Sequence, residues 1–301
     1  FRRVLFRSLI YDQTCAAEKR RRRKRGTFPD PARRVFVNQA VCEGCGDCSV
    51  ASNCLSVTPV ETEFGTKRAI DQSSCNKDFS CLNGFCPSFV TIEGGGLRKG
   101  KAPQKKTAAS ADEPAIPDPV SLPAVADKPY GVLITGIGGT GVITIGALLG
   151  VAAHLEGKGV SVLDMTGMSQ KNGSVTSHVR IAAEPQTLRA QRIATGEADL
   201  VLGCDMLTAG AHDAISKMRA GRTHTVLNTH QHPTGHLARQ PDWQYPADQV
   251  HELIHSSVGG SIDSIDATRL ATALMGDSIA TRSEEHTSEL QSRETISYAV
   301  F

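Results

Sequence analysis

Apolar runs separated by polar turns recur through the second half of the chain. The run YGVLITG from Tyr130 leads into the glycine turn GIGGTG, and the apolar stretch VITIGALLGVAAHLEG follows. This order predicts a strand, a tight turn and a helix. Alternating apolar and polar segments continue beyond it, with strands expected at 175–182, 199–203, 225–228 and 262–265 and helices at 205–219 and 249–256. The alternation indicates a doubly wound, mostly parallel, Rossmann-like α/β domain with helices on both faces.

Composition limits the class of protein. The 301 residues are 40% apolar and 21% charged, which predicts globular domains and excludes fibrous or disordered chains. A net charge of +2 argues against a nucleic-acid partner. Residues 131–153 are charge-free and long enough to span a bilayer, but their many glycines favour a strand, loop and helix, so we expect no membrane segment.

Residues 42–86 hold seven of the nine cysteines. Cys42, Cys45 and Cys48 follow C-x2-C-x2-C spacing, and Cys86 precedes a proline, as in bacterial ferredoxins. Cysteines used for metal rather than disulfides indicate a reducing, cytoplasmic location. A zinc scaffold is the alternative, although zinc sites usually pair two C-x2-C knuckles. We expect a small α+β, ferredoxin-like iron-sulfur module.

The cysteines divide into two predicted cluster sites. In two-cluster ferredoxins the last cysteine of each motif completes the other cluster. The first [4Fe-4S] cluster is then expected on Cys42, Cys45, Cys48 and Cys86. The second would take Cys54, Cys75 and Cys81 with Asp78 where a fourth cysteine would stand. This second cluster could be [4Fe-4S] with a carboxylate ligand, [3Fe-4S], or absent.

The glycine turn is a candidate anion site, because turn amides at a helix N-terminus can hold phosphate. The candidate cofactor-binding residues lie in this turn and in the polar loop at 165–174, and comprise Gly136, Gly138, Gly139, Thr140, Gly141, Ser169 and Gln170. Asp164, ending the next strand, could serve a nicotinamide dinucleotide. The alternative is that the glycines only permit close packing of strand and helix.

Three other features have plainer interpretations. His230, His232 and His236 are expected to be surface histidines rather than a zinc site. The basic run 19–25 is expected to be a solvated or interdomain face, with an anionic partner as the alternative. Cys15 is expected to be a small buried side chain.

The two ends resemble translated sequencing adapter. Residues 1–8 read FRRVLFRS, and the reverse complement of a DNA encoding them translates to RSEEHTSE, which is 282–289. We expect 1–8 and 282–301 not to be native. The expected organisation is a preceding domain's end with a basic arm at 9–26, the cluster module at 27–95, a flexible linker at 96–128 and a truncated α/β domain at 129–281.

In combination, several stretches resemble the indolepyruvate:ferredoxin oxidoreductase family, in its long fused bacterial form. They include IYDQTCAAEKRRRRKRG, VCEGCGDCS, SSCNKDFSCLNGFCPSFV, LDMTGMSQKNGSVTSHVRIA and IDATRLATALMGD. The resemblance implies a gamma-type domain at 129–281 and CoA-dependent oxidative decarboxylation of an aryl 2-oxo acid. It also implies thiamine diphosphate with Mg²⁺, electron transfer through [4Fe-4S] clusters to ferredoxin, and homo-oligomers.

The chain departs from the complete enzyme. Gly-Asp-Gly, the motif that holds the thiamine diphosphate, does not occur in it. We therefore expect those domains in missing upstream sequence, a fragment inactive alone, and unknown catalytic residues. The rival hypothesis is an independent iron-sulfur electron carrier with a nucleotide-binding domain.

Overall fold

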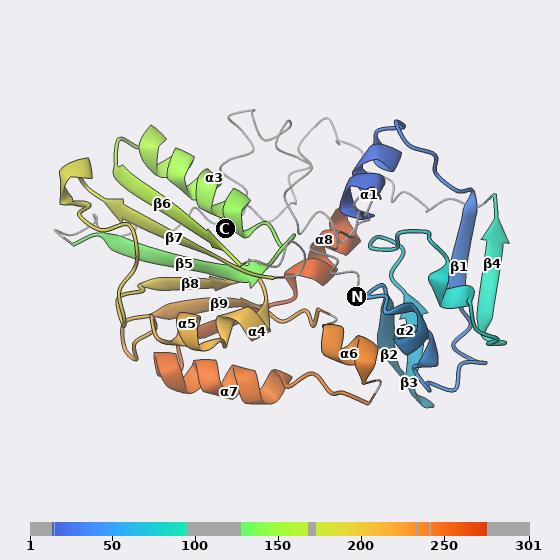
Figure 1. Ribbon diagram of the computed structural model, residues 1–301. Coiled ribbons are helices and arrows are strands. Elements are labelled where there is room, and N and C mark those ends of the chain that lie inside the picture. Colours follow the sequence, from blue (N-terminus) through green and yellow to red (C-terminus); the bar gives the residue numbers. More distant parts are fainter. Residues whose placement is uncertain are drawn as a thin grey trace, which may run out of the picture. The chain divides into compact units, whose positions relative to one another are not determined.

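The computed structural model describes residues 14, 16–94, 128–167, 173–232, 234–240 and 242–275 (Figure 1). The described residues form two compact units. The first contains the described parts of 14–94 and 234–244, and the second contains those of 128–232 and 245–275. Cys15, the termini predicted to be non-native and the predicted linker up to residue 127 lie outside the described residues.

The first unit contains two small antiparallel sheets. Strand β1 (Arg33–Val37) pairs with β4 (Phe89–Glu93), and β2 (Val57–Thr62) pairs with β3 (Gly65–Ile70). The first strand of the segment therefore pairs with the last, around an inner hairpin. Its helical segments are α1 (Ala16–Lys24), α2 (Asp47–Ser52), the 3-10 turn η1 (Ser80–Leu82) and α6 (Gly235–Arg239).

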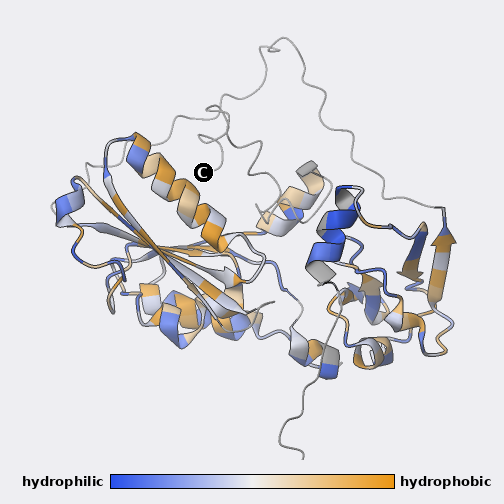
Figure 2. Ribbon diagram, turned by 45° about the horizontal axis from the view of Figure 1, so that its top comes forward, coloured by the Kyte–Doolittle hydropathy of each residue, from blue (hydrophilic) through white to orange (hydrophobic). Residues whose placement is uncertain are grey.

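Few side chains of the first unit are fully buried. Val35 of β1 and Val57 of β2 are 4% and 3% exposed. Figure 2 shows α1 as strongly hydrophilic, whereas β1 and β4 carry apolar residues. The unit's apolar core is correspondingly small.

The second unit is built on one six-stranded sheet, in the order β10-β9-β8-β5-β7-β6. Its strands are β5 (Tyr130–Ile137), β6 (Gly159–Thr166), β7 (Ser174–Ala182), β8 (Leu200–Gly203), β9 (His224–Asn228) and β10 (Ile262–Ile265). Its helical segments are α3 (Val142–Leu155), η2 (Pro185–Thr187), α4 (Met206–Ala209), α5 (His212–Ile215), α7 (Ala247–Val258) and α8 (Ala267–Met275).

Helices cover both faces of this sheet (Figure 1). On one face, Val132, Ile134 and Val179 pack against α3 through Val142. On the other, Leu133 and Leu227 belong to a larger core that includes Ile254 and Val258 of α7. Adjacent residues of β5 therefore enter opposite cores, which explains why this strand is apolar at nearly every position.

Two glycines of α3 bring the helix close to the sheet. A Cβ at Gly146 would lie 2.5 Å from Ser177 Oγ, and one at Gly150 would lie 3.0 Å from Val162 Cγ2. Side chains at these positions would push the helix away from β6 and β7. These two glycines, which lie beyond the predicted turn, therefore permit close packing of α3 on the sheet.

The predicted mixed α/β fold with a mostly parallel sheet is confirmed, with one exception. Strands β10, β9, β8 and β5 are parallel, but β7 pairs antiparallel with both β5 and β6. The connection between β6 and β7, residues 167–173, is too short for the helical crossover that parallel neighbours need.

The helix predicted at 205–219 is wrong as a single helix. Two short helices, α4 and α5, occupy this stretch and are divided at Gly210 and Ala211. A Cβ at Gly210 would lie 2.5 Å from Val250 Cγ1 of α7. Close packing against α7 therefore requires a glycine at the break, which also lowers helix propensity there.

Residues 131–153, the run long enough for a membrane span, form β5, the glycine turn and most of α3. Within the part of the chain that the structure describes, no helix has the length and apolar character to cross a membrane.

Candidate functional site

The first predicted cysteine set lies on a tight loop and the short helix α2. Gly44 has φ +79°, and a Cβ there would lie 2.3 Å from the carbonyl oxygen of Thr66 in β3. Gly46, also with positive φ, begins α2. The glycines between the cysteines therefore let the loop curl closely over the inner hairpin. Cys42 is buried, Cys45 is exposed and Cys48 is half-buried.

Burial and nearby charges act on these thiols. Burial raises the pKa of Cys48, and Cys45 adds to this, whereas hydrogen bonds from Ser49 and the charge of Arg68 lower it. Arg68, only 2% exposed, supplies a buried positive charge beside this set. Cys86 lies after η1, with its Sγ 3.0 Å from Ser88 Oγ.

The members of the second predicted set lie close enough to influence one another. Burial, followed by Cys54, Cys75 and Asp78, raises the pKa of the Cys81 thiol to about 11. The pKa of Cys75 is also raised, first by burial and then by Cys54 and Asp78. Lys77 and Phe79, on either side of Asp78, both have left-handed backbone conformations.

Asp78 is exposed, and its Oδ1 accepts hydrogen bonds from the Ser80 amide at 3.3 Å and the Ser80 hydroxyl at 3.1 Å. Among the described residues, no three His, Cys, Asp or Glu side chains are arranged to hold a single metal ion. A cluster distributes its thiolates over separate irons rather than around one ion, and the seven cysteines supply the donor chemistry that it requires.

Helix α1 contacts the loop of the second set, a role that sequence reasoning missed. Arg20 donates to the carbonyl of Ser74, and Arg23 donates to the carbonyls of Asn76 and Pro29. Lys77 pairs with Asp30 in the same region. The basic run was expected to be a solvated or interdomain face. Two of its arginines instead donate hydrogen bonds to the 74–77 loop. No periodic signal could have revealed this, because arginine-to-carbonyl contacts leave no pattern.

The glycine turn of the second unit is partly occupied by its own hydrogen bonds. The Gly138 amide donates to the Gly173 carbonyl at 2.8 Å, and the Thr140 amide and hydroxyl both donate to the Ile137 carbonyl. A Cβ at Gly136 would lie 2.3 Å from Thr140 Oγ1. Gly139 and Gly141 have positive φ. The amides of Gly138 and Thr140 therefore already donate to backbone carbonyls.

The nicotinamide interpretation of Asp164 is wrong. A dinucleotide site needs the acidic residue on the strand beside the glycine turn. Here β7 lies between β5 and β6, and Asp164 pairs in register with Ser177 of β7. Ser169 and Gln170 lie outside the described residues.

The three predicted histidines lie in different units, His230 and His232 in the second and His236 in the first. His232 is 7% exposed, so the expectation of surface histidines is wrong for this residue; its Nδ1 lies 3.6 Å from Asp205 Oδ2. Its ring meets His230 edge-on, with centroids 4.8 Å apart. His236 stacks on Trp243.

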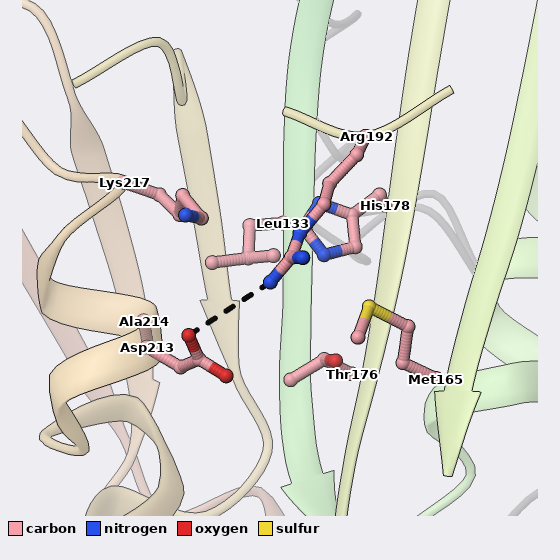
Figure 3. Close-up of a pocket in the computed structure, with 8 residues that line it drawn as sticks. All are labelled: Leu133, Met165, Thr176, His178, Arg192, Asp213, Ala214 and Lys217. Atoms are coloured by element: carbon pink, nitrogen blue, oxygen red, sulfur yellow. Dashed lines mark ion pairs between the residues drawn. The ribbon is translucent and has the colours of Figure 1, made fainter. Parts of the chain in front are cut away.

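A small hollow in the second unit was not anticipated (Figure 3). It opens on the face of the sheet opposite α3 and has room for about one water molecule. It is lined by Leu133, Met165, Thr176, His178, Arg192, Asp213, Ala214 and Lys217. His178 and Thr176 share the polar face of β7, so the alternation in VTSHVRIA was the signal that could have found them.

Comparison with known proteins identifies the class. The family model of pyruvate ferredoxin/flavodoxin oxidoreductase matches residues 131–283, and the chain belongs to this family. Its relatives include indolepyruvate oxidoreductase subunit IorB of Methanothermobacter thermautotrophicus, 31% identical over 47% of this chain and 68% of that one. The Thermococcus kodakarensis subunit IorB is 30% identical over 48% of this chain and 68% of that one. The predicted family is confirmed, and the chain is a component of a 2-oxoacid:ferredoxin oxidoreductase.

Solved structures resemble the chain only loosely. Pyruvate oxidoreductase subunit PORC of Thermotoga maritima has 16% identity and a TM-score of 0.37, over 57% of this chain and 83% of that one. The 2-oxoglutarate:ferredoxin oxidoreductase of Magnetococcus marinus has 18% identity and a TM-score of 0.38, over 57% of this chain and 26% of that one. Neither adds to the assignment.

Proposed function

We propose that this chain is the iron-sulfur relay and gamma-type domain of an indolepyruvate-type, aryl 2-oxo acid:ferredoxin oxidoreductase. One observation carries the proposal: a domain of the oxidoreductase family stands in the same chain as a seven-cysteine segment with ferredoxin spacing. The pairing of β1 with β4 around the β2-β3 hairpin supports a ferredoxin-like module. The IorB relatives support indolepyruvate as the substrate class.

In this proposal Cys42, Cys45, Cys48 and Cys86 hold a [4Fe-4S] cluster. Such a cluster, when bound, accepts and releases one electron at a time. Arg68, buried beside Cys48, stabilises added negative charge at this set.

The second set would use Cys54, Cys75 and Cys81 as thiolate ligands, with Asp78 as a carboxylate ligand or beside an open position. Because the thiol pKa values of Cys75 and Cys81 are raised, these two cysteines must lose protons when they bind iron. The arginines of α1 hold the 74–77 loop in place around them.

The remaining steps belong to the complete enzyme. Thiamine diphosphate and Mg²⁺ are proposed to bind elsewhere in it, since this sequence contains no Gly-Asp-Gly motif. The 2-oxo acid and CoA would react there, and the relay would pass the electrons to ferredoxin. The cytoplasmic location, the homo-oligomer, the domain boundaries and any ligand of the Gly136–Gly141 turn remain predictions.

The proposal is tested with the purified, anaerobically prepared chain. After reduction with dithionite and removal of the excess, the chain should reduce added ferredoxin. Given indolepyruvate, CoA and thiamine diphosphate, it should release no carbon dioxide alone. Cluster-loaded chain that cannot reduce ferredoxin would contradict the proposed electron relay. Release of carbon dioxide by the chain alone would contradict the proposal that decarboxylation takes place elsewhere in the complete enzyme.

A further inference from the structure

The turn that carries the last predicted ligand of the first cluster is fixed at its backbone. Residues 86–89 (CPSF) form this turn, in which the Phe89 amide donates to the Cys86 carbonyl at 3.4 Å. The Asn38 amide donates to the Ser88 carbonyl at 2.7 Å, directly beside the paired strands β1 and β4. Ser88 is therefore held in a defined position next to Cys86.

The same contacts bring the first and last cysteines of the first set into one region. The Asn38 carbonyl accepts the Cys42 amide at 3.0 Å, while the Asn38 amide donates to Ser88. Asn38 thus links the surroundings of Cys42 and Cys86, which are distant in sequence. This arrangement fits the proposed assignment of both cysteines to one cluster.

The side chain of Ser88 is buried and lies against sulfur. The residue is 2% exposed, and its Oγ lies 3.0 Å from Cys86 Sγ. Among the described residues, this sulfur is the only hydrogen-bond partner of the hydroxyl. Between a thiol and a hydroxyl either group can donate, but a cysteine that binds iron is a thiolate and has no proton. With the cluster bound, the Ser88 hydroxyl must therefore be the donor.

We propose that Ser88 raises the reduction potential of the first cluster by donating a hydrogen bond to the sulfur of Cys86. The inference rests on the proposed iron-sulfur function. One added electron increases the negative charge on the cluster and its sulfur ligands, while no bond is made or broken and no proton moves. A hydrogen bond to sulfur stabilises this reduced form more than the oxidised form, and burial strengthens the effect.

Neighbouring serines differ from Ser88 in what their hydroxyls contact. The Ser52 hydroxyl, on α2, donates to the Cys48 carbonyl at 2.6 Å. The Ser80 hydroxyl, beside the second set, donates to Asp78 at 3.1 Å. Oxygen atoms therefore accept these two hydrogen bonds. Ser52 is the matched control, because its hydroxyl lies near the same set of cysteines and donates to an oxygen.

The test is a redox titration of the anaerobically purified full chain, in which electron paramagnetic resonance measures the reduced first cluster. At a fixed potential, Ser88→Ala should lower the ratio of reduced to oxidised cluster about tenfold, a shift of about 59 mV for one electron. Ser88→Thr keeps a hydroxyl and should restore the wild-type potential. Ser52→Ala should leave the potential unchanged.

Iron and acid-labile sulfide are measured in every sample, which separates this inference from the proposed function. Their absence from the wild type would overturn both. Equal potentials in cluster-loaded wild type and Ser88→Ala, or an equal shift in Ser52→Ala, would overturn the role of Ser88 alone. If Ser88→Ala does not retain the cluster, resonance Raman spectra of the wild type decide. Exchange into D₂O should then shift an iron-thiolate stretching frequency, and unchanged frequencies would overturn the inference.

Discussion

At the scale of single residues, His178 shows how a strand position acquires unusual chemistry. Its side chain is 3% exposed in the centre of β7, where it pairs in register with Leu133. Burial lowers its pKa to about 4, and the positive charges of Arg192 and Lys217 add to this, against a small opposing effect of Asp213. His178 is therefore neutral at physiological pH and accepts the Ile193 amide at Nδ1.

This residue predicts a pH dependence of stability. The unfolded chain protonates His178 below its ordinary pKa of 6.5, whereas the folded chain resists protonation until about pH 4. The stability from the neutral ring is thus fully present above pH 6.5 and is lost as the pH falls toward 4. In urea denaturation, the wild type should lose about 1–3 kcal/mol more between pH 7 and 4 than His178→Gln.

The matched control is His154→Gln, because His154 is exposed on α3. Its acid sensitivity should equal that of the wild type. Parallel pH profiles for wild type and His178→Gln would show that His178 is not held neutral by its surroundings.

Asp78 is the residue that separates the two cysteine sets. Asp78→Cys would supply a thiol where C-x2-C-x2-C spacing calls for one. We expect the electron paramagnetic resonance spectrum of the reduced, anaerobic chain to change, because a ligand of the second cluster changes. Asp47→Cys, also in the cysteine segment, is the control and should leave the signals of the second cluster unchanged. An Asp78→Cys spectrum identical to that of wild type would exclude Asp78 as a ligand or near neighbour.

At the scale of elements, α1 is linked to the second cysteine loop by hydrogen bonds. The arginines of α1 reach backbone carbonyls of residues far along the chain. The helix has a strongly polar composition and little apolar surface with which to pack, so these contacts are its main described links to the loop. We infer that α1 stabilises the loop rather than the apolar core.

This predicts that Arg23→Ala loosens the second set and spares the first. The variant loses donors to Asn76 and Pro29 and the contact with the Phe28 ring. During anaerobic gel filtration it should lose the second cluster's signal several-fold faster than wild type, and retain the first. Arg25→Ala, at an exposed position of the same run, should behave as wild type. Equal loss of the second cluster's signal in the two variants would contradict the stabilising role of Arg23.

Elements were predictable where their sequence periods were long and regular. The strand at Tyr130 is apolar at nearly every position, and α7 has its apolar residues at helical spacing. The direction of β7 was missed because the alternation of residues shows which face of a strand is apolar but not which way the strand runs. The short connection at 167–173 indicates an antiparallel neighbour, because parallel strands need a longer crossover. The break at Gly210 depends on contact with Val250 of α7, which no local pattern contains.

Candidate ligands were predictable by residue type, and their surroundings were not. Cysteine spacing predicts the candidate thiol ligands directly, because iron-sulfur clusters require ligands at characteristic spacing. The buried Arg68, the arginine contacts from α1 and the hollow at Lys217 arise from residues distant in sequence. Tertiary packing alone brings such groups together.

At the scale of the whole molecule, the chain combines two units with different sources of stability. The α/β unit has a two-sided apolar core, whereas few apolar side chains are buried in the cysteine unit. A small domain with a small core commonly relies on metal or disulfide links. The cysteine unit should therefore depend on its clusters for stability, and the α/β unit should not.

The central claim is that the cysteine unit holds iron-sulfur clusters, and iron and acid-labile sulfide analysis of the anaerobically purified chain tests it most directly. We predict that the wild type contains both, that Cys45→Ser loses roughly half of each because one of two clusters is lost, and that Cys204→Ser, in the α/β unit, loses none. Zinc without iron or sulfide in the wild type, or full iron content in Cys45→Ser, would contradict the account.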